Sequence, residues 1–256
     1  CLVCALSEAK GMIKFMKIEI DTHSHTLASG HAYNTIREMA AAAAEKGLAG
    51  LAITEHAVQM PGTCHIYYFQ NMRVVPRQMC GIELLMGTEL NILNERGEVD
   101  LTQEILEELD IAIASLHPQC YKGERSREMV TRAYVNVMQN PYVDIIGHPD
   151  DGRFPVDMKT LVSEAKKTGT LLEVNNSSLS PKGFRENAMD NCREMLLECR
   201  KQEAMVVLGT DSHVDADIAN YQYAAQVLSD VNFPKELVAN TSLVKLKSCL
   251  KRRKKV

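Results

Sequence analysis

The residues of this 256-residue chain that could do chemistry are mainly histidines, placed where apolar runs end. The pairs His23/His25 and Asp211/His213 are each spaced by two residues. Because a strand sends alternate side chains to the same face, each pair can reach one ion together. With Glu89, which closes an apolar run, nine candidate metal ligands result: His23, His25, His31, His56, Glu89, His117, His148, Asp211 and His213. Nine nitrogen and oxygen donors are too many for a single ion.

The donor types indicate which metal and which reaction to expect. Magnesium and calcium sites are rich in oxygen, whereas zinc, manganese and ferrous iron accept imidazole. Zinc is preferred on availability, and manganese and iron stay open. Paired ions can clamp the oxygens of a displacement and activate water, so metal-assisted hydrolysis is the simplest reaction class. Three donors are candidate catalytic residues: Glu89 as a bridge between ions, Asp211 to orient the attacking water, and His213 as one source of the leaving-group proton.

Short apolar runs alternate with amphipathic stretches, which is typical of parallel βαβ units. We predict strands at residues 17–21, 50–54, 84–89, 111–116, 143–147, 170–175 and 205–209. One helix should begin at a capping box of Thr35 and Glu38 and stop at Gly47. Three more are predicted at residues 126–140, 157–169 and about 185–202. Seven such units predict an α/β barrel related to the TIM fold, whose site lies at the carboxyl ends of the strands.

Composition and charge narrow the class of protein further. The chain is 45% hydrophobic and 24% charged with a net charge of -4, which gives no general attraction to nucleic acid. No apolar stretch is long enough for a membrane span, and the first residues lack the features of a secretory signal. We therefore expect a cytoplasmic protein with reduced cysteines. Residues 1–15 should be a poorly ordered extension, and residues 16–256 a single barrel domain.

Candidate substrate contacts come from side chains outside the donor set. A guanidinium group binds phosphate oxygens with two parallel hydrogen bonds, so Arg73, Arg153 and Arg185 are candidate phosphate ligands. His65 lies in a loop after the second predicted strand and could approach the substrate. Asn175 ends the sixth predicted strand and could contact the substrate or a metal-binding histidine.

The donors resemble, in this order, the motifs of the PHP (polymerase and histidinol phosphatase) superfamily: an H-x-H, a second-strand His, a Glu, two single histidines and a terminal D-x-H. Over about residues 16–240 the chain looks like the YcdX-like phosphatase branch. The stretches that carry this likeness are His31, Asn71-Met72-Arg73, Asn175 to Ser178, Asn191 to Glu194 and Gly209 to His213. The resemblance implies a distorted (β/α)7 barrel with three metal ions, usually zinc, in a homotrimer.

Carried over by position, the resemblance implies a ligand set for each ion. One ion would take His23, His25, Glu89 and Asp211; a second would take Glu89, His117 and His148; a third would take His31, His56 and His213. One departure is visible after His148, where Asp150 and Asp151 stand in place of the expected Gly-Asn pair. These carboxylates could disfavour a highly anionic substrate, or Arg153 could screen them.

Four functional readings follow. The first is a phosphatase with a trinuclear zinc-type centre that acts on small phosphomonoesters. The second is a 3'-5' exonuclease or other phosphodiesterase, against which the acidic balance of the chain argues. The third is a histidinol phosphatase, which shares the chemistry of the first. The fourth is a non-catalytic module that metal ions stabilise. An open site for several ions argues against it, because one closed tetrahedral site is enough to stabilise a fold.

Overall fold

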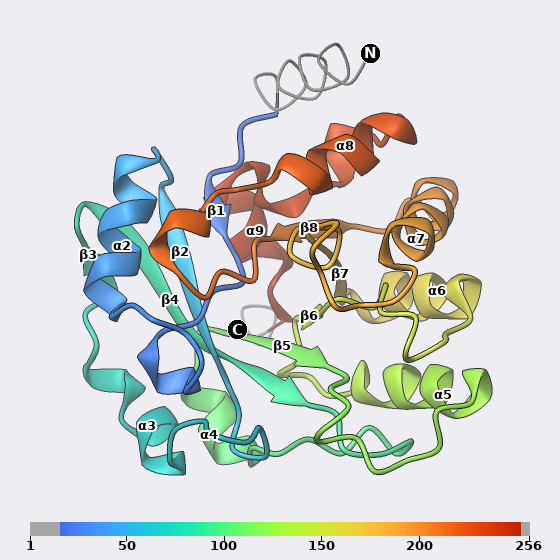
Figure 1. Ribbon diagram of the computed structural model, residues 1–256, viewed down its shortest axis with the longest axis horizontal. Coiled ribbons are helices and arrows are strands. Elements are labelled where there is room, and N and C mark those ends of the chain that lie inside the picture. The colour runs from blue at the N-terminus through green and yellow to red at the C-terminus, as the bar shows by residue number, and fades with distance from the viewer. Residues whose placement is uncertain (1–15, 252–256) are drawn as a thin grey trace.

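One parallel sheet, curled into a nearly closed barrel, is the centre of the molecule (Figure 1). The structure is a computed structural model and describes residues 16–251. Hydrogen-bonded neighbours follow the order β1-β2-β4-β5-β6-β7-β8, which confirms the predicted seven-stranded barrel. A short strand, β3, pairs antiparallel with β4 and was not predicted. The strands are β1 (Ile20–Asp21), β2 (Gly50–His56), β3 (Gln78–Met79), β4 (Ile82–Asn91), β5 (Ile111–Ser115), β6 (Ile145–Ile146), β7 (Leu171–Asn175) and β8 (Val206–Gly209).

Helices follow the strands and cover the outside of the barrel (Figure 1). They are α2 (Ile36–Glu45), α3 (Ile66–Gln70), α4 (Gln103–Glu108), α5 (Arg127–Val137), α6 (Met158–Thr168), α7 (Ala188–Gln202), α8 (Gln222–Asp230) and α9 (Leu243–Cys249). Five short 3₁₀ turns are η1 (Leu27–Ser29), η2 (Met72–Val74), η3 (Asp215–Asp217), η4 (Lys235–Leu237) and η5 (Ala239–Thr241). The four predicted helices correspond to α2, α5, α6 and α7. Within residues 16–251, no helix combines the length and the apolar character that crossing a membrane requires.

Local sequence signals explain where helices begin and end. At α2, Thr35 Oγ1 accepts a hydrogen bond from the backbone N–H of Glu38, and the Glu38 carboxylate accepts one from the N–H of Thr35. This is the predicted capping box, and Gly47 follows with a φ of 79°. Helix α6 begins with Asp157 Oδ1 accepting from the N–H of Thr160 at 2.7 Å. It ends at Gly169 with a φ of 71°.

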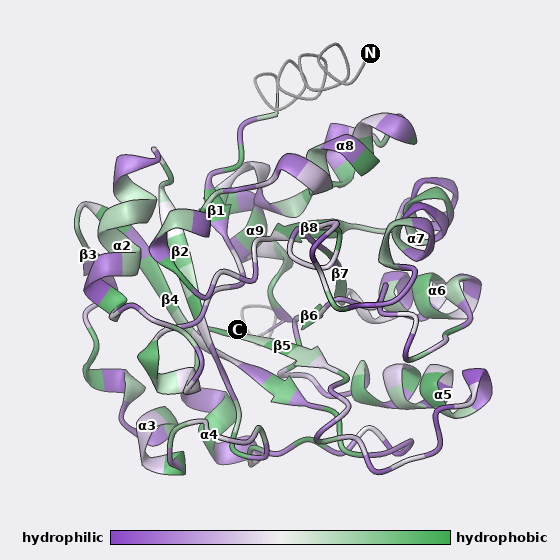
Figure 2. Cartoon of the chain, in the orientation of Figure 1, coloured by the Kyte–Doolittle hydropathy of each residue, from purple (hydrophilic) through white to green (hydrophobic). Residues whose placement is uncertain are grey.

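The apolar core forms two layers. The larger layer lies between the strands and the helices and contains Leu51 and Ile53 of β2. A smaller cluster contains the alternate residues of the same strands, which point to the other face of the sheet and fill the barrel interior. Examples are Ala52, Leu85, Leu171 and Val207. Residues of α9 belong to the smaller cluster and close the amino-terminal end of the barrel. Figure 2 shows the apolar strands at the centre of the molecule.

Toward the carboxyl ends of the strands, the residues that face the barrel interior become polar. In β4 the residues two and four positions after Leu85 are Gly87 and Glu89. In β7 the residues two and four positions after Leu171 are Glu173 and Asn175. Because alternate residues of a strand share a face, an apolar floor at the amino-terminal end gives way to carboxylates and imidazoles at the carboxyl end.

Strands β1 and β8 meet just beyond their ends. An isolated parallel bridge joins Ser24 to Ser212. The N–H of Asp211 donates to the carbonyl of His23 at 2.9 Å, and the N–H of His25 donates to the carbonyl of Ser212 at 2.8 Å. The barrel is therefore closed at the level of the first and last ligand motifs.

Candidate metal centre

The nine predicted ligands gather at the carboxyl ends of the strands. His23 and His25 follow β1, His56 ends β2, and Glu89 lies near the end of β4. The remaining donors come from the segments after η1, β5, β6 and β8. Seven of the nine side chains are buried; His31 is exposed and His213 is half-buried. The fold thus brings together residues that are up to 190 positions apart in the chain.

Glu89 lies at the centre of the cluster. Its carboxylate oxygens are within 3.6 Å of five imidazole nitrogens: His56 Nδ1 at 2.7 Å, His148 Nε2 at 2.9 Å, His117 Nε2 at 3.3 Å, His23 Nε2 at 3.5 Å and His25 Nε2 at 3.6 Å. Oε1 faces His117 and His148, whereas Oε2 faces His23, His25 and His56. The two oxygens of one carboxylate therefore serve two groups of imidazoles.

Asp211 and His31 complete the cluster on the side of β8. Asp211 Oδ1 lies 3.3 Å from His25 Nε2 and 3.6 Å from His23 Nε2. His31 Nε2 lies 3.0 Å from His213 Nε2, although the two residues are 182 positions apart. His25, His56 and His213 form one group with ligand atoms within 4.8 Å of one another.

The spacing of these donors fits a transition metal. At a zinc–nitrogen distance of about 2.0–2.1 Å, tetrahedral geometry separates two ligands by about 3.3 Å. Nε2 of His23 lies 3.1 Å from Nε2 of His25, and most distances from the carboxylates to the imidazoles fall near the same value. Glu89 Oε2 and His56 Nδ1 are buried and have no hydrogen bond in the described part of the chain, although they face each other. Cations bound in the cluster would satisfy both atoms.

Hydrogen bonds at Nδ1 orient several of the imidazoles so that Nε2 points into the cluster. Each of five histidines has its Nδ1 within hydrogen-bond distance of an oxygen, which leaves Nε2 to face the centre. The pairs are His23 with Glu173 Oε1 at 2.7 Å, His117 with Asn91 Oδ1 at 2.8 Å, His213 with the Asp211 carbonyl at 2.9 Å, His31 with the Ser29 carbonyl at 3.0 Å and His25 with Ser29 Oγ at 3.1 Å.

Burial keeps imidazoles of the cluster neutral. It lowers the pKa of His25 well below the ordinary value, and neighbouring imidazoles add to this effect. Burial also lowers the pKa of His31 and of His117. His23 differs: burial alone would lower its pKa, but the carboxylate of Glu173 and its acidic neighbours outweigh burial and raise it. Since a metal binds the neutral ring, most of these residues are ready to act as ligands at neutral pH.

The two ligand carboxylates stay ionised despite their burial. Burial alone would raise the pKa of Glu89, but the surrounding imidazoles hold it well below the usual range. The pKa of Asp211 behaves in the same way, with His23 as the largest opposing influence. Ionised oxygens and neutral nitrogens at ligand spacing form a set that attracts a cation.

A supporting layer of carboxylates was missed in the sequence. Glu173 contacts His23, and Glu55 accepts hydrogen bonds from the N–H of Thr26 at 3.1 Å and from Ser29 Oγ at 2.6 Å. Asp21 accepts from the N–H of Thr210 at 3.1 Å. The signal that could have found this layer is a charged residue inside a buried strand, because such a carboxylate must have partners.

Backbone strain and close packing occur at the same place. His148 and Asp211 have φ values of 31° and 55°, a region that non-glycine residues rarely adopt. Gly209 has no room for a side chain, because a Cβ there would lie 2.8 Å from His23 Cβ and would collide with the Glu173 carboxylate.

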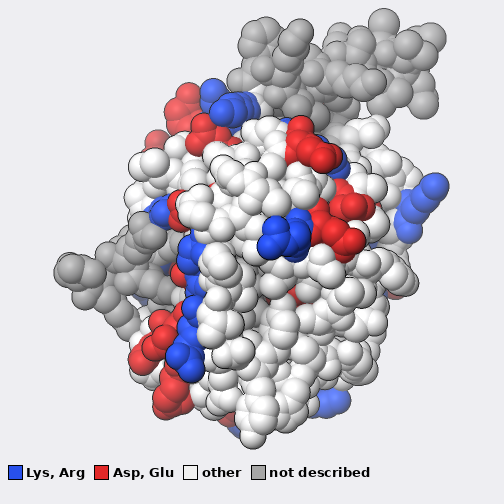
Figure 3. Space-filling view, turned by 90° about the vertical axis from the view of Figure 1, so that its left-hand side faces the viewer, with Lys and Arg blue, Asp and Glu red and all other residues white. Residues whose placement is uncertain are grey.

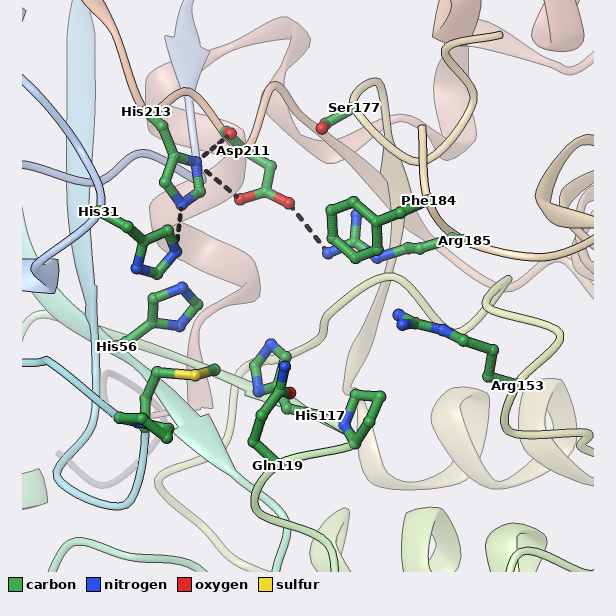
Figure 4. Close-up of a pocket in the computed structure, with 13 residues that line it drawn as sticks. His31, His56, His117, Gln119, Arg153, Ser177, Phe184, Arg185, Asp211 and His213 are labelled. Carbon is green, nitrogen blue, oxygen red and sulfur yellow. Dashed lines mark hydrogen bonds and ion pairs between the residues drawn. The ribbon is translucent and has the colours of Figure 1, made fainter. Parts of the chain in front are cut away.

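A cavity of about 570 Å³ opens onto the candidate metal ligands (Figure 4). Figure 4 shows the imidazoles on one side and Arg153, Phe184 and Arg185 on the other. The lining residues are His31, His56, Met60, Pro61, His117, Pro118, Gln119, Arg153, Ser177, Phe184, Arg185, Asp211 and His213.

Of the predicted substrate residues, some line the cavity and others do not. Arg153 and Arg185 line the cavity. Asn175 is buried behind it and donates to Glu173 Oε2 at 3.0 Å and to Asp211 Oδ2 at 3.2 Å, so it supports the ligands. His65 caps the start of α3, and Arg73 is exposed in η2; the fold does not bring these two side chains into the cavity lining. Their contact with substrate stays a prediction.

Asp150 and Asp151, the two carboxylates that follow His148 in place of the expected Gly-Asn pair, lie in different environments. Asp151 Oδ2 pairs with Arg153 Nη2 at 2.5 Å, so this carboxylate is screened. Asp150 is fully buried, and burial raises its pKa to about 7. Neither carboxylate lines the cavity.

Comparison with known proteins agrees with the fold and indicates the family of the chain. The model of the PHP domain family matches residues 21–180. A protein of Caldanaerobacter subterraneus subsp. tengcongensis named as a probable phosphatase is 42% identical over 246 residues, covering 96% of each chain. A protein of Clostridium novyi with the same description is 43% identical over 241 residues, covering 94% of this chain and 98% of the relative. The chain belongs to the PHP domain family, and its relatives support a phosphatase.

A solved structure supports the same architecture. The histidinol phosphate phosphatase of Lactococcus lactis, in complex with zinc, L-histidinol and phosphate, superposes with a TM-score of 0.57 at 15% identity. The match covers 84% of this chain and 94% of the other. At this identity the likeness establishes the barrel fold, and the imidazole and carboxylate groups of this chain are of the kind that bind zinc.

Proposed function

We propose that this protein is a phosphomonoesterase that uses a trinuclear zinc-type centre. The observation that carries the proposal is the position of Glu89, whose carboxylate lies within 3.6 Å of five imidazoles. The proposed ligand sets are those implied by the family: His23, His25, Glu89 and Asp211; Glu89, His117 and His148; and His31, His56 and His213. The spacing and charge of these side chains support a metal centre at this position. The compact donor groups are His23, His25 and Glu89; His56, Glu89 and His117; and His25, His56 and His213.

Bound ions of this type would activate water and neutralise charge on a phosphoryl group. Glu89 would hold two ions at a fixed separation, since its two oxygens face different imidazoles. Asp211 would bind through Oδ1 only, because Arg185 Nη2 and Asn175 Nδ2 both donate to Oδ2. His213 lines the cavity and is half-buried. As a ligand through Nε2 with Nδ1 held by the Asp211 carbonyl it has no free ring nitrogen, so water would supply the proton of the leaving oxygen.

Arg153 and Arg185 would bind the phosphate oxygens on the side of the cavity that faces the imidazoles. Both side chains line the cavity, and Arg185 is 6% exposed. A buried guanidinium is a strong donor to phosphate because little water competes with it. The proposal therefore assigns phosphate recognition to the loops that follow β6 and β7.

Two measurements test the proposal. Elemental analysis of protein purified without added metal should give about three zinc ions per chain, and manganese or iron in their place would change only the metal. The metal-loaded protein should hydrolyse p-nitrophenyl phosphate much faster than bis(p-nitrophenyl) phosphate. Faster hydrolysis of the diester would instead favour the phosphodiesterase reading. If chelation lowers the melting temperature but the loaded protein hydrolyses no ester, the metal only braces the fold.

The surface gives no separate support for a nucleic-acid substrate on the face that is drawn in Figure 3. There, Lys and Arg stand beside Asp and Glu, and much of the face is uncharged. Backbone-tracking nuclease grooves are broadly basic, whereas this chain has a net charge of -4, so the monoester reading is favoured. Histidinol phosphate belongs in the same substrate screen, since that reading differs from ours only in the alcohol.

The family resemblance also supports a homotrimer, and we include it in the proposal together with a cytoplasmic location. The cysteines in the described part of the chain are free, which fits a reducing compartment. Light scattering coupled to size exclusion tests the assembly: a mass of three chains supports it, and a mass of one or two chains contradicts it.

A further inference from the structure

Two loops form the side of the cavity that faces the imidazoles. One follows β6 and carries Arg153; the other follows β7 and carries Phe184 and Arg185. The N–H of Gly152 donates to the carbonyl of Glu186 at 2.7 Å, which joins the two loops. A Cβ at Gly152 would lie 2.5 Å from that carbonyl oxygen, so the contact leaves no space. The loops therefore present Arg153, Phe184 and Arg185, which we call the arginine–phenylalanine wall, as one surface.

Both guanidinium groups of the arginine–phenylalanine wall have fixed partners. Arg153 Nε lies 2.9 Å and Nη2 lies 2.5 Å from oxygens of Asp151. Arg185 Nη1 donates to Ser178 Oγ at 2.9 Å, and Nη2 donates to Asp211 Oδ2 at 3.1 Å. Because these contacts restrict the guanidinium groups, the phenyl ring between them has a fixed environment.

Phe184 is the exposed member of the arginine–phenylalanine wall. Its ring centroid lies 5.1 Å from Arg153 Cζ and 5.3 Å from Arg185 Cζ, within cation–π distance. The side chain is 71% exposed, and it is the one strongly exposed large hydrophobic residue of segment 16–251 that lines the cavity. Gly183, directly before it, donates from N–H to the Ser180 carbonyl at 2.8 Å. The loop thus holds an apolar ring toward the cavity although water surrounds much of it.

Other apolar residues also line the cavity, beside the polar Gln119 and Ser177. Met60, Pro61 and Pro118 line the cavity together with Phe184. The imidazoles lie on one side of the cavity, and the guanidinium groups of Arg153 and Arg185 lie on the other. A phosphate group bound by those charged groups leaves the alcohol part of the ester to contact the apolar residues. An apolar, flat alcohol gains contact with such residues, and a small polar one does not.

We propose that Phe184 determines substrate specificity by stacking against a flat, aromatic leaving group of a phosphomonoester. This inference rests on the proposed phosphatase function and names the substrate class for the same site. Phe184 packs against the alcohol part only, so it contributes to selectivity between esters and takes no part in bond breaking.

The test compares three monoesters whose alkoxide leaving groups are of similar basicity: benzyl, cyclohexylmethyl and ethyl phosphate. With metal-loaded enzyme we expect kcat/KM for benzyl phosphate to exceed that for ethyl phosphate by about tenfold. Phe184→Ala should lose most of this preference while its kcat/KM for ethyl phosphate stays within about twofold. Tyr67→Ala is the matched control, because Tyr67 is 70% exposed and does not line the cavity; it should keep the preference.

Calorimetry with benzylphosphonate and ethylphosphonate, which cannot be hydrolysed at the P–C bond, separates this inference from the function. If no monoester is turned over, the proposed function fails, and a tighter binding of benzylphosphonate that Phe184→Ala removes would still support the aromatic contact. Equal kcat/KM for benzyl and cyclohexylmethyl phosphate would overturn stacking. An equal loss on all three esters in Phe184→Ala, or a changed oligomeric mass with unchanged selectivity, would overturn the assignment of Phe184.

Discussion

Glu173 and His23 form a fully buried pair, with Glu173 Oε1 at 2.7 Å from His23 Nδ1. The second oxygen of the same carboxylate accepts a hydrogen bond from the N–H of His148 at 2.8 Å. One carboxylate on β7 therefore orients a ligand that follows β1 and the backbone of a ligand that follows β6. In this way the interior of the barrel sets the direction of His23 Nε2 toward Glu89 and Asp211.

Replacing Glu173 should weaken metal binding more than it weakens the fold. We expect Glu173→Gln to lower the affinity for zinc by about 10- to 100-fold, because the amide accepts a weaker hydrogen bond from His23 and no longer favours the required ring orientation. Competition with a coloured chelator measures this affinity. Glu128→Gln, an exposed change on α5, is the control. Equal zinc affinity in Glu173→Gln and the native protein would show that this pair does not orient the ligand.

Glu89→Gln should abolish turnover while the protein still folds. The change removes the negative charge that faces five imidazoles and one of the two oxygens that would bridge ions. Activity should fall below detection, and circular dichroism should show native secondary structure. Glu83→Gln is a matched control on the same strand, since Glu83 pairs with Lys247 at the opposite end of the barrel. Full activity in Glu89→Gln would count heavily against the metal scheme.

Arg185→Lys should lower kcat/KM by about tenfold or more. A lysine keeps the charge, but one ammonium group cannot reach Ser178, Asn175 and Asp211 as the guanidinium does. Steady-state kinetics with a monoester measures the effect. Arg193→Lys on the surface of α7, where Arg193 pairs with Asp230, is the control. Unchanged kinetics in Arg185→Lys would remove Arg185 from phosphate binding.

Asp157 gives a pH-dependent contribution to stability at the start of α6. Hydrogen bonds from Thr160 lower its pKa below the ordinary value of 3.8. The contribution is therefore complete above this value and is lost as the pH falls through the lower pKa of the folded state. At pH 7, Asp157→Ala should reduce the free energy of unfolding by about 1 kcal/mol, and Asp157→Asn by less.

Urea unfolding at a series of pH values checks this prediction. The difference between the native protein and Asp157→Ala should stay constant from about pH 7 to pH 5 and shrink between about pH 4 and pH 2. A difference that is independent of pH down to pH 2 would mean that the carboxylate charge has no part in the cap.

The strands and the ligand histidines could be predicted because both depend on local pattern. Apolar runs of strand length placed β2, β4, β5, β7 and β8, and donors at their ends marked the mouth of the barrel. The confirmed strands β1 and β6 are shorter than predicted, with two residues each. The antiparallel β3 was missed, because it consists of Gln78 and Met79 and has no apolar period.

The supporting residues and the substrate side of the cavity could not be predicted in the same way. Glu173 stands out in the sequence as a charged residue inside an apolar strand, but its partner His23 is known only once the fold brings the two together. Phe184 lies in a loop without periodicity, and its position depends on contacts with the loop after β6. Arg73 was proposed from its guanidinium group and from the family resemblance; it lies in η2, outside the cavity lining, and its contact with phosphate stays a prediction.

The seam between β1 and β8 also has a consequence for biosynthesis. The ribosome makes His23 and His25 early, but their backbone partners at Asp211 and Ser212 emerge only after four fifths of the chain, and Asp211 is itself a proposed ligand. A nascent chain that stops before this point lacks both the seam and its last donors. Complete loading of the proposed centre would therefore come late in synthesis, and a chain truncated before Asp211 would lack two of the proposed ligands.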